Sequence, residues 1–334
     1  DFTFEELQTL TVTERFNPET GEFKNYRYSP ESPNSVSSDA VISLFVDHSG
    51  MLWAGTFDSG VNIINYKGVN FEHYYYDSTL KNGVVNKMIW AIAGDYLGNL
   101  WIGTKNGLSH FEPDNGNFKS YFSQGKCNGV LSILDIRAIL PDKNTLWLGT
   151  SGGGLIHFNP QTCNVKKYTH DEDAPSTLSS NYVRVVFKDN HHQLWIGTRN
   201  GLNKLNITTG EIHRYQADDS DKGALPHNRI RSLFEDEDGV LWVGTSGGLS
   251  RFNAKTDSFH TISFEQGLLS DNDIRNIWKD NKGILWLATE KGLTRLDVDN
   301  KKALFFYEKD GLTNNALYSL LVDGDYLWLT TNNG

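Results

Sequence analysis

The sequence predicts an all-β fold, a single seven-bladed β-propeller with four antiparallel strands in each blade. Three observations lead to this prediction. A tryptophan recurs at intervals of 42–48 residues, a phrase that is most often Leu-Trp-x-Gly-Thr surrounds it, and no segment has the sustained apolar period of a helix. A repeat of this length has room for four short strands, which is the content of one propeller blade. The recurring residues are Trp53, Trp101, Trp147, Trp195, Trp242, Trp286 and Trp328.

Four strands are expected in each repeat, and the repeat around Trp242 shows their order. An apolar strand over residues 229–234 leads through an Asp-x-x-Gly turn into the Leu-Trp strand, and a glycine-containing turn then leads into a third strand at 249–253. A turn of the Asn-Pro-x-Thr type, as at residues 159–162, precedes a fourth strand that ends in aromatic residues. We expect the first strand to be innermost. We name as top the face that carries the Gly-Thr-x-x-Gly turns, and as bottom the face that carries the other two kinds of turn.

The two ends of the chain are predicted to complete the seventh blade together. Residues 316–334 supply its first two strands, and residues 9–28 read as its third and fourth strands. Pairing them in one sheet would close the ring and remove exposed sheet edges. We therefore expect residues 1–334 to form one domain.

The composition is that of a globular and acidic protein. The 334 residues are 38% hydrophobic, include 18 Phe, 14 Tyr and 9 Trp, and carry a formal net charge of −10. This content excludes a disordered chain, and the negative charge argues against a general affinity for nucleic acid. The longest apolar runs, such as residues 41–46, have the length of strands, so no membrane span is predicted.

The repeated phrase D-x-x-G-x-L-W-x-G-T-x-x-G-L, with the following F-N-P-x-T-G turn, resembles the two-component regulator propeller repeat. The resemblance covers essentially the whole chain, with departures at the shortened turns 141–144 and 323–326 and at His191-His192. It implies a periplasmic, ligand-sensing part of an inner-membrane receptor of the histidine kinase type. It also implies a homodimer in the full receptor, a membrane reached only through segments outside this chain, and a kinase or cyclase output domain elsewhere.

A basic and aromatic ring is predicted at the top of the inner strands. Aligning the residue eleven before each tryptophan, or ten where the turn is shorter, brings four arginines and two aromatic residues to one central mouth, and the glycine turns of the same face add three basic residues. Arginine suits carboxylate or sulfate, and an aromatic ring stacks on a sugar, so the pattern predicts a small anionic ligand, an acidic or sulfated oligosaccharide. The candidate ligand-binding residues are Trp90, Arg137, Arg184, Arg231, Arg275, Tyr318, Lys105, Arg199 and Lys291.

A structural role for these arginines is the alternative interpretation. In it, the guanidinium groups bond loop carbonyls of the next blade or a channel water. The seven repeat tryptophans are assigned to the core, because each has the same place beside a leucine in the middle of a strand.

Some segments match the sequence of an enzyme motif but not the structural context that the motif requires. The Gly-x-Ser-x-Gly matches around Ser151 and Ser246 lie in strand-to-strand turns and lack the strand-turn-helix context of a nucleophile elbow. No phosphate loop is found, and His191-His192 and the acidic turns do not have metal-ligand spacing. We therefore expect no catalytic residue, no metal and no cofactor in this segment. A propeller glycosidase or lyase acting on polysaccharide and a protein-docking scaffold remain as alternative functions.

The two cysteines are predicted to be unbonded. Cys127 precedes the inner strand of its blade, near the top face, and Cys163 lies in a bottom turn of the same blade. A disulfide requires Cα atoms within about 7 Å, and a blade is taller than that.

Overall fold

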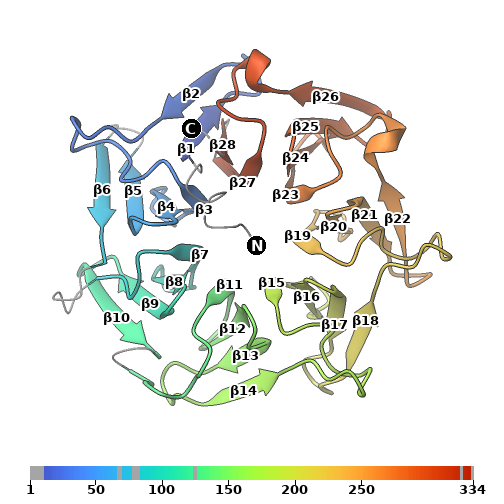
Figure 1. Cartoon of the computed structure of the whole chain (residues 1–334), viewed down its shortest axis with the longest axis horizontal. Helices are drawn as coiled ribbons and strands as arrows, with labels where there is room; N and C mark the ends of the chain where they lie inside the picture. The colour runs from blue at the N-terminus through green and yellow to red at the C-terminus, as the bar shows by residue number, and fades with distance from the viewer. Residues whose placement is uncertain (1–10, 66–69, 77–82, 123–125, 324–325, 332–334) are drawn as a thin grey trace. The chain divides into compact units, whose positions relative to one another are not determined.

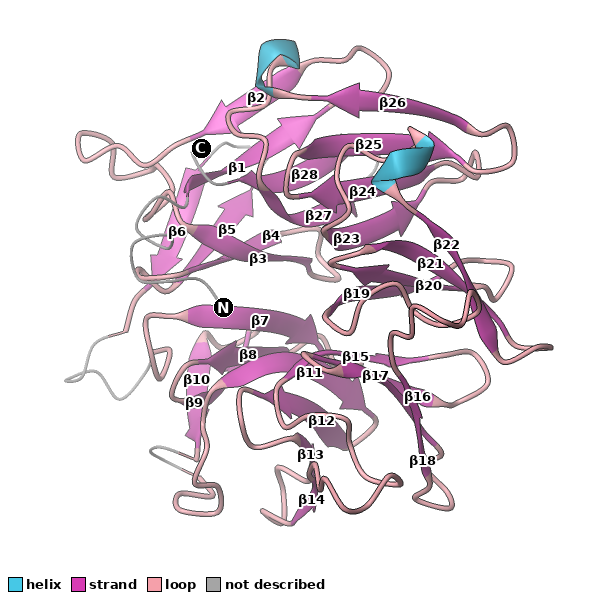
Figure 2. Ribbon diagram, turned by 45° about the vertical axis from the view of Figure 1, so that its right-hand side comes forward, coloured by secondary structure: helices cyan, strands magenta, loops and turns pink. Residues whose placement is uncertain are grey.

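The structure, a computed structural model, describes residues 11–65, 70–76, 83–122, 126–323 and 326–331. Within them, seven four-stranded antiparallel sheets form a seven-bladed β-propeller, which confirms the predicted fold (Figure 1). Figure 2 shows that strands and loops make up nearly all of the drawn chain. Two short 3-10 helices interrupt them, η1 (Phe264–Gln266) and η2 (Glu308–Asp310).

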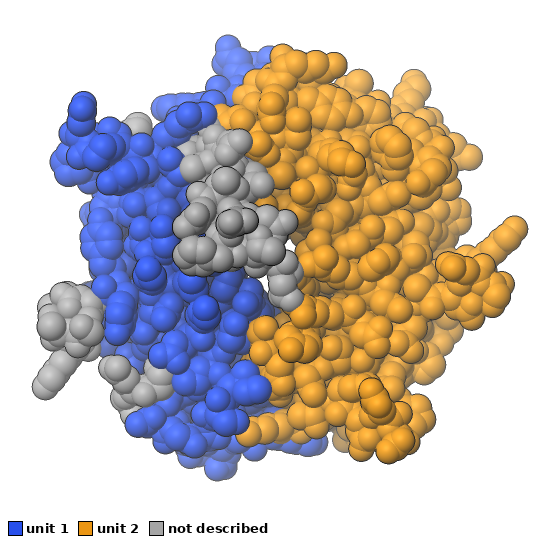
Figure 3. Space-filling model, in the orientation of Figure 1, with its two compact units in different colours: residues 1–148, 156–166, 321–334 blue, residues 149–155, 167–320 orange. Residues whose placement is uncertain are grey.

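The chain divides into two compact units, shown in Figure 3. Unit 1 comprises residues 1–148, 156–166 and 321–334, and unit 2 comprises residues 149–155 and 167–320. The boundary passes through two sheets, the one formed within residues 136–168 and the one that contains residues 317–323. The prediction that residues 1–334 are a single domain stays a prediction.

The first three sheets in chain order follow the predicted pattern of four sequential strands. Their inner strands are β3, β7 and β11, and the repeat tryptophans Trp53, Trp101 and Trp147 lie on the second strand of each. The strands are β3 (Val41–Val46), β4 (Leu52–Thr56), β5 (Val61–Asn65), β6 (Asn70–Tyr74), β7 (Ile89–Gly94), β8 (Leu100–Thr104), β9 (Gly107–Glu112), β10 (Asn117–Tyr121), β11 (Ile136–Asp142), β12 (Thr145–Thr150), β13 (Leu155–Phe158) and β14 (Val165–Tyr168).

The next three sheets repeat the same order. They are β15 (Val183–Lys188), β16 (Leu194–Thr198), β17 (Gly201–Leu205), β18 (Ile212–Tyr215), β19 (Ile230–Glu235), β20 (Leu241–Thr245), β21 (Gly248–Asn253), β22 (Ser258–Ile262), β23 (Ile274–Lys279), β24 (Leu285–Thr289), β25 (Gly292–Asp297) and β26 (Lys302–Phe306).

The seventh sheet joins the two ends of the chain as predicted. Its strand order is β2-β1-β28-β27, formed by β1 (Thr11–Phe16), β2 (Phe23–Tyr26), β27 (Leu317–Asp323) and β28 (Tyr326–Thr331). Arg15 lies opposite Trp328, and Phe16 lies opposite Leu327. Residues 9–10, 324–325 and 332–334 of the predicted closing blade lie outside the described residues.

The repeat tryptophans form the core, as expected. In β20 all five residues are buried, and Trp242 is only 4% exposed. Side chains alternate between the two faces of a strand, so continuous burial means that both faces are covered. In unit 1, the Trp53 ring packs 5.2 Å from that of Phe111 in the following sheet. The tryptophan therefore belongs to the packing between adjacent blades.

In five of the repeats, the turn acid is hydrogen-bonded to the tryptophan. Asp47 accepts a hydrogen bond from the Trp53 indole nitrogen at 2.7 Å, and its other oxygen accepts the amides of Ser49 and Met51. The same indole-to-carboxylate bond joins Trp147 to Asp142, Trp195 to Asp189, Trp242 to Asp236 and Trp286 to Asp280. One carboxylate thus shapes the turn and anchors the core ring.

The prediction for the cysteines is wrong. Cys127 and Cys163 form a disulfide with Cα atoms 5.4 Å apart. The prediction assumed that a blade keeps its top and bottom from the inner to the outer strand. Sheets twist by roughly 20–25° per strand, so the turn before an outer strand swings away from the bottom of the inner strand and toward the neighbouring blade. Cys163 has φ 63°, in the left-handed place that Gly210, with φ 80°, holds in the next repeat.

Candidate functional site

In unit 1, the predicted top residues Trp90 and Arg137 are brought together. The Arg137 guanidinium carbon lies 3.6 Å from the centre of the Trp90 ring, a cation–π contact between neighbouring inner strands. Arg137 also donates two hydrogen bonds to the carboxylate of Asp135, at 2.7 and 2.9 Å. The Trp90 indole nitrogen is buried and has no hydrogen-bond partner among the described residues.

Lys105 lies in the turn between β8 and β9, where it is exposed. Its backbone amide donates to the carbonyl of Met88, just before β7, at 3.2 Å. This bond places the glycine turn at the start of the inner strand, as predicted.

In unit 2, Arg231 and Arg275 are held by one carboxylate. Arg231 donates to both oxygens of Asp273 at 2.7 and 2.6 Å, and Arg275 approaches the same carboxylate at 3.4 Å. Burial alone would raise the pKa of Asp273, but the two arginines more than offset it and hold the pKa below its ordinary value. Asp273 is therefore ionised in the folded protein at neutral pH, and it fixes both guanidinium groups.

Arg275 has further partners in its surroundings. It donates to the carbonyl of Leu317 at 3.4 Å, pairs with Glu290, and lies 4.4 Å from the centre of the Tyr318 ring. The carbonyl contact is of the kind expected if the arginine has a structural role. Tyr318 carries a guanidinium on one face, as Trp90 does in unit 1.

The other predicted residues of unit 2 are placed as follows. Arg199 lies 4.4 Å over the ring of Tyr182, and Lys291 is exposed and forms an ion pair with Asp271 at 3.2 Å. Arg184 is half-buried in β15, at the position that corresponds to Arg231 in β19.

Sequence reasoning missed Arg229, which belongs to the same group of charges. Its side chain is half-buried, and within the described part of the chain no acidic group pairs with its guanidinium. Burial lowers its pKa, and the nearby charges of Arg231, Arg199 and Arg275 lower it further, partly opposed by Asp273. We name Arg199, Arg229, Arg231 and Arg275 the arginine cluster. It is a concentration of positive charge in an acidic protein.

Asp135 and Asp273 were also missed, although the sequence carries a signal for them. Each stands two residues before the arginine of its own inner strand, as Asp135-Ile-Arg137 and Asp273-Ile-Arg275. At the equivalent position before Arg184 and Arg231 stand Tyr182 and Arg229. Comparing these triplets between repeats locates the carboxylates but not all of their partners, since Asp273 bonds Arg231 of the preceding inner strand more closely than Arg275 of its own.

The residues of the enzyme-like motifs lie in turns. Ser246 accepts a hydrogen bond from Arg231 and donates one to Asp273, so it serves the arginine cluster. His191 and His192 are exposed in the turn before β16, and His192 takes φ 61° where four other repeats have glycine. Among the described residues, no group of three His, Cys, Asp or Glu side chains has the geometry of a metal site.

The fold defines a repeat protein of the seven-bladed β-propeller class. The model of the two-component regulator propeller family matches residues 83–106, 177–200 and 224–247, which lie in three of the repeats. This confirms the resemblance stated from the sequence. Among proteins of curated function, none matches the chain.

Solved structures share the fold at low sequence identity. Two are extracellular domains of putative hybrid two component systems from B. thetaiotaomicron. One has a TM-score of 0.71 and 18% identity and the other a TM-score of 0.53 and 20% identity, each over 96% of this chain. The chain spans about half the length of these domains, 47% and 49%. A catalytically inactive virginiamycin B lyase from Staphylococcus aureus, solved with quinupristin, has a TM-score of 0.67 and 13% identity, covering 89% of this chain and 97% of the lyase.

Among the described residues, no helix has the length and apolar character needed to cross a membrane.

Proposed function

We propose that this chain is an extracytoplasmic ligand-sensing module of a membrane receptor of the two-component type. The ligand is a small anion, an acidic or sulfated oligosaccharide, bound at the arginine cluster. The observation that carries the ligand class is Arg229, a half-buried guanidinium without an acidic partner among the described residues and beside three further arginines. The proposed receptor is periplasmic, works as a homodimer and passes the signal to a kinase or cyclase output domain.

Two observations support the receptor assignment. The repeats are those of two-component regulators, and the fold is that of extracellular domains of hybrid two component systems. The Cys127–Cys163 disulfide also supports a location outside the cytoplasm, because such bonds persist in oxidising compartments.

The geometry of the arginine cluster fits the recognition of an anion. Asp273 and Ser246 hold Arg231 in place, so little side-chain freedom is lost when a ligand binds. Arg229 brings positive charge that no carboxylate of the described residues neutralises directly, and a carboxylate or sulfate can accept two parallel bonds from its planar group. An anion would also relieve the repulsion between these arginines.

Signalling requires that the ligand bind one receptor arrangement more tightly than another, since only this difference shifts the equilibrium. A ligand on a rigid blade can do this by contacting a neighbouring domain or the second protomer in only one of the arrangements. The sensing role therefore rests on the full receptor, whereas the ligand class can be tested on this chain alone.

The test is a thermal-shift and calorimetric screen with galacturonate oligomers, sulfated disaccharides and the matching neutral sugars. We expect an anionic probe to bind, and Arg229→Gln to weaken binding at least tenfold without lowering the melting temperature of the free protein. The matched control is Arg251→Gln, which removes an exposed arginine of β21 and should leave binding unchanged. Equal binding of the neutral sugars, or equal loss in both variants, would overturn the proposal. Cleavage of a probe would favour the propeller glycosidase or lyase instead.

A further inference from the structure

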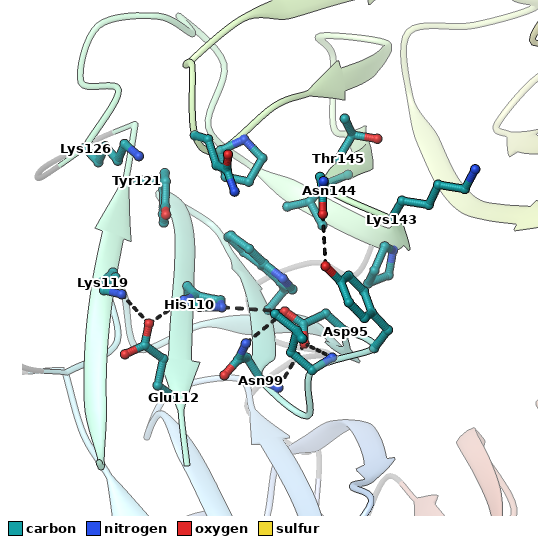
Figure 4. A pocket seen from close by; sticks show the side chains of 17 residues that line it. Asp95, Asn99, His110, Glu112, Lys119, Tyr121, Lys126, Lys143, Asn144 and Thr145 are labelled. Carbon is teal, nitrogen blue, oxygen red and sulfur yellow. Dashed lines mark hydrogen bonds and ion pairs between the residues drawn. The ribbon is translucent and has the colours of Figure 1, made fainter. Parts of the chain in front are cut away.

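A second candidate site lies within unit 1, away from the arginine cluster. A pocket of about 430 Å³ opens between the sheets β7–β10 and β11–β14, lined by Trp101, His110, Tyr121 and the turns that begin at Asp95 and Pro141. This volume is within the range of about 300–1,000 Å³ that is usual for small-molecule sites. Figure 4 shows the ring of His110 near the carboxylates of Asp95 and Glu112, with Asn144 and Thr145 across the pocket.

The acid of this repeat departs from the pattern of the five repeats in which the turn acid is bonded to the tryptophan. Asp95 directs its second oxygen to the side-chain nitrogen of Asn99 at 3.2 Å, in place of the tryptophan indole. Within the described residues, the Trp101 indole nitrogen therefore has no acceptor, whereas Trp195 is bonded to Asp189 at 2.8 Å. A donor that other repeats use internally is left at the pocket.

Tyr121 shows the same departure. The equivalent tyrosine of the repeat around Trp195 is Tyr215, whose hydroxyl donates to Asp257 at 2.7 Å. The hydroxyl of Tyr121 makes no hydrogen bond to the described part of the chain. Both tyrosines lie opposite the leucine that follows the glycine turn, so the comparison is between matching positions.

His110 adds a buried ring nitrogen that has no hydrogen-bond partner among the described residues. It lies opposite Trp101, where the repeat around Trp195 has Lys204, and its ring centre is 4.2 Å from that of Trp101. The residue is 8% exposed, and its Nδ1 has no hydrogen-bond partner in the described structure. The carboxylates of Asp95 and Glu112 stand 3.8 and 3.9 Å away, beyond hydrogen-bond distance.

We propose that this pocket binds a neutral, polyhydroxylated ring, a mono- or disaccharide. A hydroxyl group both donates and accepts hydrogen bonds. The hydroxyls of such a ring can therefore accept hydrogen bonds from the free donors of Trp101 and Tyr121 and donate hydrogen bonds to His110 or Asp95. The aromatic rings of Trp101 and Tyr121 offer apolar surface to the C–H face of such a ring. The negative charges of Asp95 and Glu112 disfavour the binding of a carboxylate or sulfate. The positive charges of Lys126 and Lys143, which are exposed at the same pocket, disfavour the binding of an ammonium group.

The disulfide holds the two sides of this pocket together. Lys126, next to Cys127, lines one side, and Gln161, two residues before Cys163, lines the other. Its covalent bond keeps both segments in position before a ligand arrives, which reduces the entropy lost on binding.

A comparable pocket in unit 2 does not have the same free groups. It lies beside Trp242 and Arg251 and has a volume of about 1,100 Å³. There the acid Asp236 is bonded to Trp242 and also to Lys279. The free donors are therefore a property of the pocket in unit 1, and size alone does not distinguish the two.

The test is titration of the whole chain with glucose, galactose, N-acetylglucosamine, maltose and cellobiose, followed by calorimetry and saturation-transfer NMR. We expect at least one probe to bind with one-to-one stoichiometry and a Kd tighter than about 10 mM, and galacturonate and glucosamine to bind at least tenfold more weakly at this pocket. His110→Lys, which installs the residue of the equivalent repeat, should weaken binding at least tenfold.

Two further variants protect this test from a folding defect. Gln161→Ala changes an exposed side chain on the opposite side and should weaken binding several-fold, while Lys204→His, the reverse change in the other repeat, should have no effect. Arg229→Gln should leave neutral-sugar binding intact, so the two sites can fail separately. No binding by any of the five sugars, or equal binding by His110→Lys and Gln161→Ala, would overturn the proposal.

Discussion

The carboxylate of Asp236 accepts a hydrogen bond from the indole nitrogen of Trp242 at 3.0 Å, although both residues are only 4% exposed. The same carboxylate bonds the amide of Val240 and the ammonium group of Lys279, at 2.9 Å in each case. Burial alone would raise the pKa of Asp236, but these hydrogen bonds more than offset it, and the pKa lies below its ordinary value. A turn residue is thus ionised inside the wall between two blades.

Asp236→Ala should destabilise the protein by about 2–3 kcal/mol, because it leaves the Trp242 indole and the Val240 amide without their acceptor. The measurement is urea unfolding followed by tryptophan fluorescence. Asp238→Ala is the matched control, since Asp238 pairs with the same lysine at 3.2 Å but its side chain is 78% exposed. It should cost less than about 1 kcal/mol. Equal losses in the two variants would show that the buried indole bond contributes nothing.

Removing the disulfide by Cys127→Ser and Cys163→Ser should lower stability by about 2–4 kcal/mol, because the bond closes a loop between residues 36 apart. Thermal unfolding with and without reductant measures this effect. The reduced wild-type protein should unfold with the double variant, whose own transition should not respond to reductant. A wild-type transition that is indifferent to full reduction contradicts the prediction.

Acidification from about pH 7 to pH 5 should lower the free energy of unfolding through the buried His110 and the half-buried His157. Burial lowers the pKa of His110 despite Asp95 and Glu112, and it lowers that of His157 despite Asp142. In this range the unfolded chain, with histidine pKa values of about 6.5, binds more protons than the folded one, so stability falls as pH falls. Urea unfolding at several pH values provides the measurement. His110→Gln with His157→Gln should flatten the slope, and His191→Gln, at an exposed position, should leave it unchanged.

Gly244→Ala should cost more than Gly210→Ala, and chemical unfolding of both variants gives the comparison. A Cβ at Gly244 would lie 2.5 Å from the carbonyl oxygen of Ile274 and 2.2 Å from the hydroxyl of Ser232, so the next inner strand must move. We expect a loss of about 2–3 kcal/mol. Gly210 has open space around it and only an unfavourable φ of 80°, for which about 1 kcal/mol is expected. The reverse order would mean that the inner strands separate easily.

The fold could be predicted because its signal is repeated. The repeat tryptophans, from Trp53 to Trp328, each lie on the second strand of their sheet, counted from the inner strand. The phrase around each tryptophan therefore predicts the strands before and after it. The pairing of β1 with β28 also followed from the sequence, because the missing half of one repeat stood at the other end of the chain.

The site could be predicted only in part, because alignment of repeats places a residue without identifying its partners. It brought Arg231 and Arg275 to one end of their strands, but not the Asp273 carboxylate that binds both. The disulfide was missed for a different reason, since the twist that brings Cys127 to Cys163 accumulates across a whole blade. The pocket at His110 was missed because it is distinguished by hydrogen bonds that other repeats form and that this repeat does not form.

The pairing of β1 with β28 also has a consequence for the order of folding. In the other six sheets each strand pairs with its neighbour in the sequence, so those ladders can form by local, rapid hairpin closure. The β1–β28 ladder must wait until distant ends of the chain meet, and long-range pairings of this kind form slowly. The closing sheet should therefore be the last to acquire protection from hydrogen exchange during refolding. Before the β1–β28 ladder forms, newly made chains are most exposed to pairing with one another.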